Sequence, residues 1–254
     1  MKEQWRLLHT ENNSAYRNMA IDWAVLKANS EGKIPPTVRF YTWKPSAISI
    51  GYFQSLNEEI DIDICKKYGV DYVRRITGGG AVYHENELTY SIVIPESHPQ
   101  IPKNIMESYG RICGAIIKGL KHLSIESSYV PINDIIVDGK KISGNAQTRK
   151  SKTVLQHGTV LTDVDVDKMF SLLRVPDEKI KDKLIADVKQ RVTSIKHILG
   201  EEVTFAKVAQ AMKVGFEEEF NIELEEGSLT KQELEDTLRF EKEYFSTKEW
   251  NHKK

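Results

Sequence analysis

The order of hydrophobic and polar residues predicts both helices and strands in the first third of the chain. Residues 13–33 carry apolar side chains at helical spacing, bounded by a capping residue and a glycine. Residues 37–43 and 47–53 are rich in β-branched and aromatic residues, which is typical of strands. A further helix over residues 57–69 is expected to end at Gly69, because glycine readily takes the left-handed conformation that closes a helix.

Predicted strands dominate the middle of the chain, and helices dominate its last part. Strands are expected over residues 70–77 and 81–94, a long amphipathic helix over residues 103–123, and a hairpin with a further strand within residues 133–162. From Val164 onward the pattern is helical in several pieces. Strands that cluster in the middle with helices around them favour an α+β domain over regular βαβ alternation.

Composition narrows the class of protein. The chain has 254 residues without repeats or low-complexity tracts, so we expect one domain over residues 1–254, with a helical C-terminal part from about residue 164. The net charge of -1 gives no basic field that would favour nucleic acid or an anionic membrane. Two cysteines, Cys65 and Cys113, are too few for a disulfide framework, and no apolar run approaches ~18 residues. These features predict a soluble cytoplasmic protein.

Three consecutive glycines, Gly78, Gly79 and Gly80, separate two of the predicted strands. The peptide N–H groups of such a loop form a concave array of donors, and Arg74 and Arg75 add forked cations beside it. The combination suits a carboxylate or a phosphate, although a glycine triplet is also compatible with a plain tight turn. The dinucleotide fingerprint and the P-loop are excluded, because GxGxxG spacing and a GK[ST] ending are absent. The motif therefore indicates an anion-binding loop on a sheet.

The stretch NDIIVDGKKISGNAQTR holds the other group of candidate residues. Lys140 and Lys141 follow a predicted Asp-Gly turn and point to opposite faces of a strand. Lys141 becomes a second anion ligand if its face meets the glycine loop, whereas Lys140 is interpreted as a solvated hairpin lysine. Asp134 is either a magnesium ligand near phosphates or a turn cap.

Other chemistry-bearing residues give weaker signals. His84 and His157 lie in strand-like contexts, where a histidine is also compatible with a hydrogen-bonded core position. The spacing of the histidines and cysteines matches no metal-binding motif. Cys65 and Cys113 lie on predicted helices and are interpreted as packing residues.

Together, these motifs resemble the lipoate–protein ligase and octanoyltransferase superfamily, which shares the biotin–lipoyl ligase catalytic fold. RRITGGGAVYHE is similar to the family's RRxxGGGxVxHD motif, with Glu85 in place of the aspartate. DGKKISGNAQTR aligns Lys141 with the family's catalytic lysine, and LQHGTVL matches the strand that follows. The similarity extends from Trp5 to Asn251 and implies a mixed, largely antiparallel central sheet flanked by helices. The GRGRxGR-type loop of biotin ligases is absent.

The resemblance also implies roles for individual residues. Lys141 is expected to be catalytic, by offsetting charge on the acyl carbonyl and the α-phosphate, and Asp134 is expected to hold Mg²⁺. Lipoate- or adenylate-binding roles are implied for Arg74, Arg75, Gly78, Gly79, Gly80, Ala81, His84, Asn133, Gly144, His157 and Gly158.

The superfamily contains two reactions, and the sequence favours the ATP-dependent one. Octanoyltransferases resemble this chain in its N-terminal third, yet they carry a nucleophilic cysteine either before the lysine hairpin, where this chain has none, or before the HG pair, where it has Val154. A valine cannot replace a thiolate nucleophile. We therefore expect a lipoate–protein ligase that uses ATP and Mg²⁺ to form lipoyl-adenylate. The alternatives are an octanoyl-[carrier protein]:protein N-octanoyltransferase and a non-catalytic carrier-binding relative.

The resemblance implies protein partners as well. The acceptor is expected to be a lipoyl carrier domain of the 2-oxoacid dehydrogenase E2 or glycine cleavage H protein type. The sequence stops three residues after FSTKEWN, the segment that many ligases follow with an accessory C-terminal domain. The chain is therefore expected to be a ligase catalytic subunit without that domain, with a separate small accessory subunit as a further partner.

Overall fold

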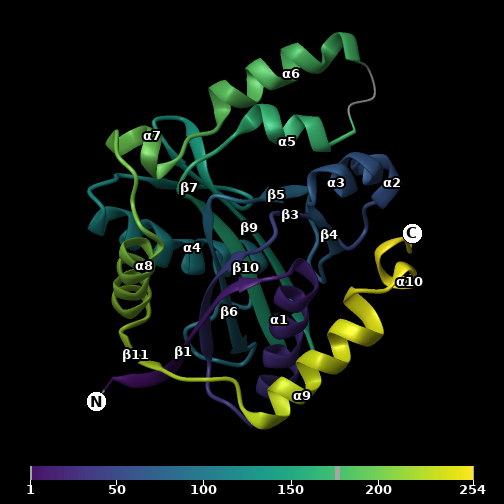
Figure 1. The fold of residues 1–254 in the computed structure, drawn as a ribbon. Helices are drawn as coiled ribbons and strands as arrows, with labels where there is room; N and C mark the ends of the chain where they lie inside the picture. The colour runs from purple at the N-terminus through teal and green to yellow at the C-terminus, as the bar shows by residue number, and fades with distance from the viewer. Residues whose placement is uncertain (1, 175–177, 254) are drawn as a thin grey trace.

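The computed structural model describes residues 2–174 and 178–253, and its largest element is an eight-stranded sheet (Figure 1). In order across this sheet, the strands are β11 (Ile222–Glu226), β1 (Glu3–Asn13), β2 (Thr37–Trp43), β6 (Glu87–Pro95), β10 (Thr153–Leu161), β9 (Lys140–Lys150), β8 (Asp134–Val137) and β7 (Ser128–Val130). Strand β1 pairs in parallel with both of its neighbours, and the other neighbours are antiparallel. The mixed, largely antiparallel sheet expected from the sequence is confirmed.

Helices cover both faces of the main sheet (Figure 1). On one face lie α4 (Ile105–His122) and α8 (Phe205–Phe220), and on the other lie α1 (Ala15–Ser30) and, packed against α1, α9 (Lys231–Phe240), the π-helix η1 (Glu241–Phe245) and α10 (Lys248–Asn251). Successive side chains of β2 point to opposite faces of the sheet. Phe40 therefore packs in the core under α8, and Tyr41 packs in the core under α1.

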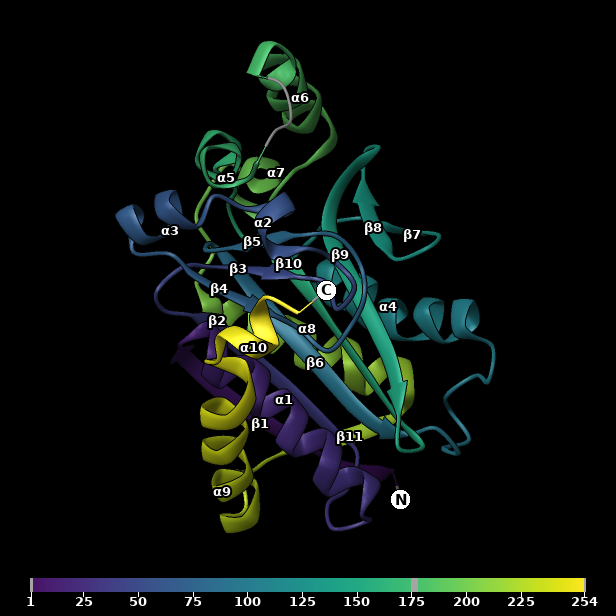
Figure 2. The same ribbon diagram turned by 90° about the vertical axis from the view of Figure 1, so that its right-hand side faces the viewer.

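A smaller, three-stranded sheet lies beside the main one. Its strands, in order, are β4 (Asp71–Arg74), β3 (Ala47–Ile50) and β5 (Val82–His84). Five short or medium helices lie at the same end of the molecule (Figure 2): α2 (Leu56–Glu59), α3 (Ile62–Tyr68), α5 (Val166–Leu172), α6 (Glu178–Arg191) and α7 (Ile195–Leu199). Residues 75–81, with the glycine triplet, join β4 to β5. Thr77 of this loop contacts His157 of β10, so the loop lies against the main sheet.

The turns follow the expected chemistry. Ser14 caps α1 by accepting a hydrogen bond from a backbone N–H of the first turn. Gly69 ends α3 with a φ of 64°, the left-handed conformation predicted for it. Asp138 and Gly139 also have positive φ and close the β8–β9 hairpin, which fixes Lys141 near the start of β9.

Three strands lie outside those expected from the sequence. β1 and β7 are not predicted, and the part after residue 164, expected to be helical in several pieces, also contains β11. β11 buries only Ile222 and Leu224 among glutamates, and it pairs with the distant N-terminal strand, with Ile222 opposite Glu3. Local periodicity does not reveal so short a strand with so remote a partner. Within the described ranges, no helix combines the length and apolar character needed to span a bilayer.

Candidate active site

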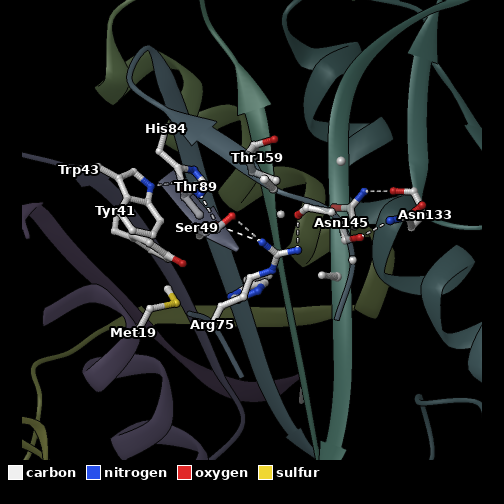
Figure 3. A pocket seen from close by; sticks show the side chains of 18 of the residues that line it. Met19, Tyr41, Trp43, Ser49, Arg75, His84, Thr89, Asn133, Asn145 and Thr159 are labelled. Carbon is white, nitrogen blue, oxygen red and sulfur yellow. Dashed lines mark hydrogen bonds between the residues drawn. The ribbon is translucent and has the colours of Figure 1, made fainter. Parts of the chain in front are cut away.

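A cavity of about 170 Å³ lies between the small sheet and the α1 face of the main sheet. Figure 3 shows Tyr41 and Trp43 on one side of it, Asn133 and Asn145 on the other, and Arg75 between them. One end of the cavity is therefore aromatic and the other is polar. This division suits a ligand with an apolar chain and a polar reacting group.

Most of the site residues predicted from the sequence line this cavity. They come from the glycine loop, β5, the β8–β9 hairpin and β10, which the fold brings together. The predicted residues in its lining are Arg75, Gly79, Gly80, Ala81, His84, Asn133, Lys141, Gly144, His157 and Gly158. Gly78 belongs to the same loop without lining the cavity, and Arg74 and Asp134 also lie outside its lining.

Lys141 reaches the cavity from β9. Its backbone is held on both sides, because the Thr193 N–H donates to the Lys141 carbonyl and β8 places Ile136 opposite Lys141. The Lys141 side chain is 40% exposed, and its ammonium nitrogen lies 2.7 Å from Asp134 Oδ1. Lys140 does not line the cavity, as the alternation of side chains along a strand predicts.

Asp134 pairs with Lys141 and offers no preformed Mg²⁺ site. Proteins usually hold Mg²⁺ through one or two carboxylates together with substrate phosphates and water. Here the single carboxylate is already the counter-ion of the Lys141 ammonium. In the part of the chain that the structure describes, no three His, Cys, Asp or Glu side chains are grouped to hold a metal ion. The expected magnesium site is therefore not preformed, and Asp134 as a Mg²⁺ ligand stays a prediction.

Arg75 holds the glycine loop in shape. Its buried guanidinium donates to the carbonyl oxygens of Gly78 and Gly80, each at 2.7 Å, and to the Ser49 carbonyl oxygen at 2.9 Å. Burial lowers the pKa of Arg75 to about 10, which leaves the side chain charged at neutral pH. Gly79 has a φ of 94°, a conformation that other residues rarely adopt, so this position requires glycine.

The glycine loop also presents backbone donors. Among the described residues, the N–H groups of Gly78, Gly79 and Gly80 find no hydrogen-bond acceptor. Gly79 and Gly80 line the cavity that the Lys141 side chain also lines. Donors of this kind stabilise negative charge that develops on a carbonyl oxygen. The site can therefore stabilise the oxyanion of an acyl-transfer reaction with a cation and with backbone N–H groups.

Arg74 does not reach the cavity, contrary to the ligand role implied by the motif. Its side chain is fully buried, and its guanidinium donates to backbone carbonyl oxygens in two other segments of the chain. Burial lowers the pKa of Arg74. The alternation of side chains along an extended chain explains the difference, since Arg74 and its neighbour Arg75 point to opposite sides.

A buried hydrogen-bond chain connects His157 to α1. The Thr77 hydroxyl accepts a hydrogen bond from Arg75 Nε at 3.1 Å and donates to His157 Nε2 at 2.7 Å. The ionised Asp22 carboxylate can only accept, so the His157 proton is on Nδ1, which donates to Asp22 Oδ2 at 3.2 Å. Burial lowers the pKa of His157. Burial alone would raise the pKa of Asp22, but its charged and hydrogen-bonding partners, Arg39 first, hold that pKa below its usual value.

His84 has a parallel arrangement on the other side of Arg75. The Ser49 hydroxyl accepts from Arg75 Nη1 at 3.1 Å and donates to His84 Nε2 at 2.8 Å. His84 Nδ1 then donates to Glu87 Oε1 at 2.6 Å. Trp43 stacks on the His84 ring, with 4.0 Å between the ring centroids. Each histidine therefore links a hydroxyl partner of Arg75 to a buried carboxylate.

Sequence reasoning missed the aromatic wall of the cavity and the residue that holds Asn133. Tyr41 and Trp43 alternate along β2, a signal that the period of two in RFYTW already contains. Asn145 Nδ2 donates to the Asn133 carbonyl oxygen at 2.9 Å. A Cβ on Gly158 would lie 2.1 Å from Asn145 Oδ1, so the glycine of the HG pair leaves space for this asparagine.

Neither of the two cysteines of the chain lies at the cavity. Cys65 and Cys113 are both buried, and burial raises their pKa values to about 11 and about 12. Thiols with such pKa values are protonated at neutral pH, whereas the thiolate is the nucleophile. The site therefore has no cysteine that can form an acyl-enzyme.

Known proteins resemble this chain in sequence and in structure. Residues 14–217 match the lipoyl protein ligase A/B catalytic domain. The octanoyltransferase LipM of Anoxybacillus flavithermus is 38% identical over an alignment of 276 positions. The alignment covers 100% of this chain and 99% of that relative. The bi-partite lipoate protein ligase of Thermoplasma acidophilum, solved in a study that includes its E2 lipoyl domain, is 31% identical. Its TM-score is 0.90, and the match covers 98% of this chain and 96% of the other.

A second solved structure, lipoate-protein ligase A bound with ATP, is 29% identical with a TM-score of 0.83, and 99% of each chain is covered. The octanoyltransferase LipM has a higher sequence identity to this chain than either ligase. Its name supports the octanoyltransferase alternative better than the ligase activity expected from the sequence. Ligase activity is supported only at the level of the family. The chain belongs to the family of the lipoyl protein ligase A/B catalytic domain.

Proposed function

We propose that this chain transfers an octanoyl group from a carrier-protein thioester to the lysine amine of a lipoyl carrier domain. One observation carries the proposal: Lys141 lines a cavity with an aromatic wall together with Gly79 and Gly80, whose N–H groups are unengaged. The octanoyltransferase name of a relative that matches the whole chain favours this reaction over ATP-dependent ligation. The intact lysine and glycine loop favour an enzyme over a non-catalytic carrier-binding protein.

The size and lining of the cavity support an acyl chain as its ligand. Its volume of about 170 Å³ is below the ~300–1,000 Å³ of most small-molecule sites. Met19, Tyr41 and Trp43 give it an apolar wall. A slender acyl chain suits this space.

In the proposed reaction, the lysine amine of the lipoyl domain attacks the carbonyl carbon of the thioester. A C–N bond forms, the C–S bond breaks, and the amine proton leaves with the carrier thiol. Negative charge develops on the carbonyl oxygen, where the Lys141 ammonium and the N–H groups of Gly79 and Gly80 are the available donors. By comparison with oxyanion-hole donors, one such group is worth about 10²–10³ in rate.

The acyl group moves directly from donor to acceptor in this proposal. Cys65 and Cys113 are buried, and their raised pKa values leave them protonated. The hydroxyls of Thr77 and Ser49 are each engaged with Arg75 and with a histidine. Because no cysteine lies at the cavity and these two hydroxyls are engaged, the proposed reaction has the octanoyl donor and the lipoyl domain bound at the same time.

A lipoate–protein ligase that forms lipoyl-adenylate is the second candidate. The specific observation in its favour is that the cavity lining contains no cysteine. The likeness to a bi-partite ligase at a TM-score of 0.90 agrees with it. In that reaction ATP would supply the activation, and a separate small accessory subunit would be the expected partner.

Mass spectrometry of a purified lipoyl domain separates the two candidates. The full chain is incubated with the domain and with either octanoyl-carrier protein alone, or lipoate together with ATP and Mg²⁺. We expect octanoylated domain from the first donor in the absence of ATP. A lipoyl domain with its acceptor lysine replaced by arginine is the control for specific modification.

The other outcomes of this assay decide against the transferase. Product that forms only with ATP would replace the transferase by the ligase. Product from neither donor would favour the non-catalytic relative, which binds carrier domains without modifying them.

A further inference from the structure

Arg74 ties together two segments that are far apart in the sequence. Its Nε and Nη2 atoms donate to three carbonyl oxygens of residues 250–253, at 2.5 to 3.1 Å. Its Nη1 atom donates to three carbonyl oxygens of residues 51–54, at 2.6 to 3.3 Å. A guanidinium has five N–H donors, and these six acceptors engage all of them.

The backbone of Arg74 binds the same C-terminal segment. The Arg74 N–H donates to Asn251 Oδ1 at 2.7 Å, and Trp250 Nε1 donates to the Arg74 carbonyl oxygen at 2.8 Å. Arg74 and Asn251 are buried, with exposed fractions of 0% and 3%. If residues 250–253 moved away, Arg74 would become exposed to solvent or would lose its hydrogen-bond acceptors. A buried donor without an acceptor costs free energy, so this displacement is unfavourable.

Residues 51–54 in turn support the glycine loop. The Tyr52 N–H donates to the Thr77 carbonyl oxygen at 2.8 Å. Gly51 lies so close to the loop that a Cβ on it would be 1.9 Å from the Gly79 carbonyl oxygen. The position of Gly79 at the cavity therefore depends on the position of Gly51.

We infer that Arg74 is a positioning residue through which the segment 250–253 fixes the glycine loop at the acyl-binding cavity. The contacts run from residues 250–253 to Arg74, from Arg74 to residues 51–54, and from there to Thr77 and Gly79. Arg75 holds the same loop from the cavity side. The inference rests on the proposed function only in the choice of an acyl chain as the ligand.

Two variants weaken the contacts between Arg74 and the segment 250–253. Trp250→Phe removes the Nε1 donor and keeps an aromatic ring. Asn251→Ala removes the acceptor of the Arg74 N–H, together with the bonds that Asn251 Nδ2 donates to the carbonyl oxygens of Phe245 and Thr247. In the full chain, both should weaken octanoate binding in titration calorimetry by about three- to tenfold. Both should also speed amide hydrogen exchange of residues 77–80. With octanoyl-carrier protein, the KM should rise more than kcat falls.

Two further variants make the test specific. Gly51→Ala presses directly on Gly79 and should reproduce the loss of octanoate binding. Arg6→Ala is the matched control, because Arg6 ties β1 to α9 through a buried ion pair with Glu233 and does not line the cavity. It should lower the thermal midpoint while octanoate binding and exchange at residues 77–80 stay unchanged.

The outcomes separate this inference from the proposed function. If Trp250→Phe and Asn251→Ala lower the thermal midpoint and leave binding and exchange at residues 77–80 unchanged, Arg74 has only a structural role and the inference is overturned. If the unmodified chain binds no octanoate, the acyl-binding role of the cavity fails. Hydrogen exchange of residues 77–80 in the variants then still decides whether the segment 250–253 positions the loop.

Discussion

Gly144 lies directly against the ammonium group of Lys141. A Cβ on Gly144 would be 2.8 Å from Lys141 Nζ and 2.7 Å from Lys141 Cε. Asp134 Oδ1 contacts the same ammonium nitrogen at 2.7 Å. The glycine of the KKISG stretch therefore leaves the space in which the candidate catalytic cation lies.

Replacing Gly144 by alanine should displace the Lys141 ammonium without unfolding the chain. The added methyl group meets the flexible end of a lysine, so the free energy of unfolding should change by less than about 1 kcal/mol. A misplaced catalytic group costs up to about a hundredfold in rate. Urea unfolding and steady-state octanoyl transfer measure the two effects.

Gly110→Ala is the control for this variant, because its Cβ would make an ordinary contact with Tyr129 at 3.5 Å. Its transfer rate should match that of the unmodified chain. An unchanged rate in Gly144→Ala would mean that the position of the Lys141 ammonium does not matter for the reaction.

His157 should make the folded state less stable at mildly acidic pH. Burial lowers the pKa of His157 from 6.5 in the folded state. Below pH 6.5, His157 therefore binds a proton in the unfolded chain before it does so in the folded chain. Stability is therefore full above about pH 6.5 and falls toward the folded pKa, by at most roughly 1.4 kcal/mol per pH unit. Asp22, whose pKa is also lowered, adds a loss only at lower pH, below its ordinary value of 3.8.

Urea unfolding near pH 7.5 and pH 5.5 tests this directly, and His157→Gln should make the difference in unfolding free energy between the two pH values smaller. His122→Gln is the matched control, because the His122 side chain is 43% exposed. The same pH dependence in His157→Gln and in the unmodified chain would show that His157 is not the responsible group.

Removing both cysteines should leave octanoyl transfer intact. Cys65 and Cys113 are buried away from the cavity, so Cys65→Ala combined with Cys113→Ala should cost stability through small cavities and spare the rate. Activity at unchanged kcat/KM, corrected for the folded fraction, is the expected result. A hydroxylamine-sensitive adduct on either cysteine, seen by mass spectrometry after incubation with octanoyl-carrier protein, would instead establish a covalent intermediate.

The parts of the fold that could be predicted from the sequence are those with local causes. The β8–β9 hairpin follows from the Asp138–Gly139 turn, and the end of α3 follows from Gly69. β11 has no such local cause, since Ile222 and Leu224 become a strand only through pairing with β1 at the other end of the chain.

The same distinction applies to the site. The motifs predict Lys141 and the glycine loop as parts of the site. They do not show which of Arg74 and Arg75 lines the cavity. Only the docking of residues 250–253 and 51–54 decides that Arg74 faces away from the cavity. The role of Asp22 is equally hidden, because its partners lie on strands β2, β6 and β10, and the pattern of its own helix does not show them.

The most direct test of the account measures what Lys141 contributes to acyl transfer. Single-turnover transfer from octanoyl-carrier protein to a lipoyl domain is followed for the unmodified chain, Lys141→Ala and Lys140→Ala, with circular dichroism to establish folding. Because the Lys141 ammonium lies at the cavity and Lys140 does not line it, we predict a fall of about 10²–10³ in rate for Lys141→Ala and little change for Lys140→Ala. A folded Lys141→Ala variant that transfers octanoate at nearly the unmodified rate would contradict the account.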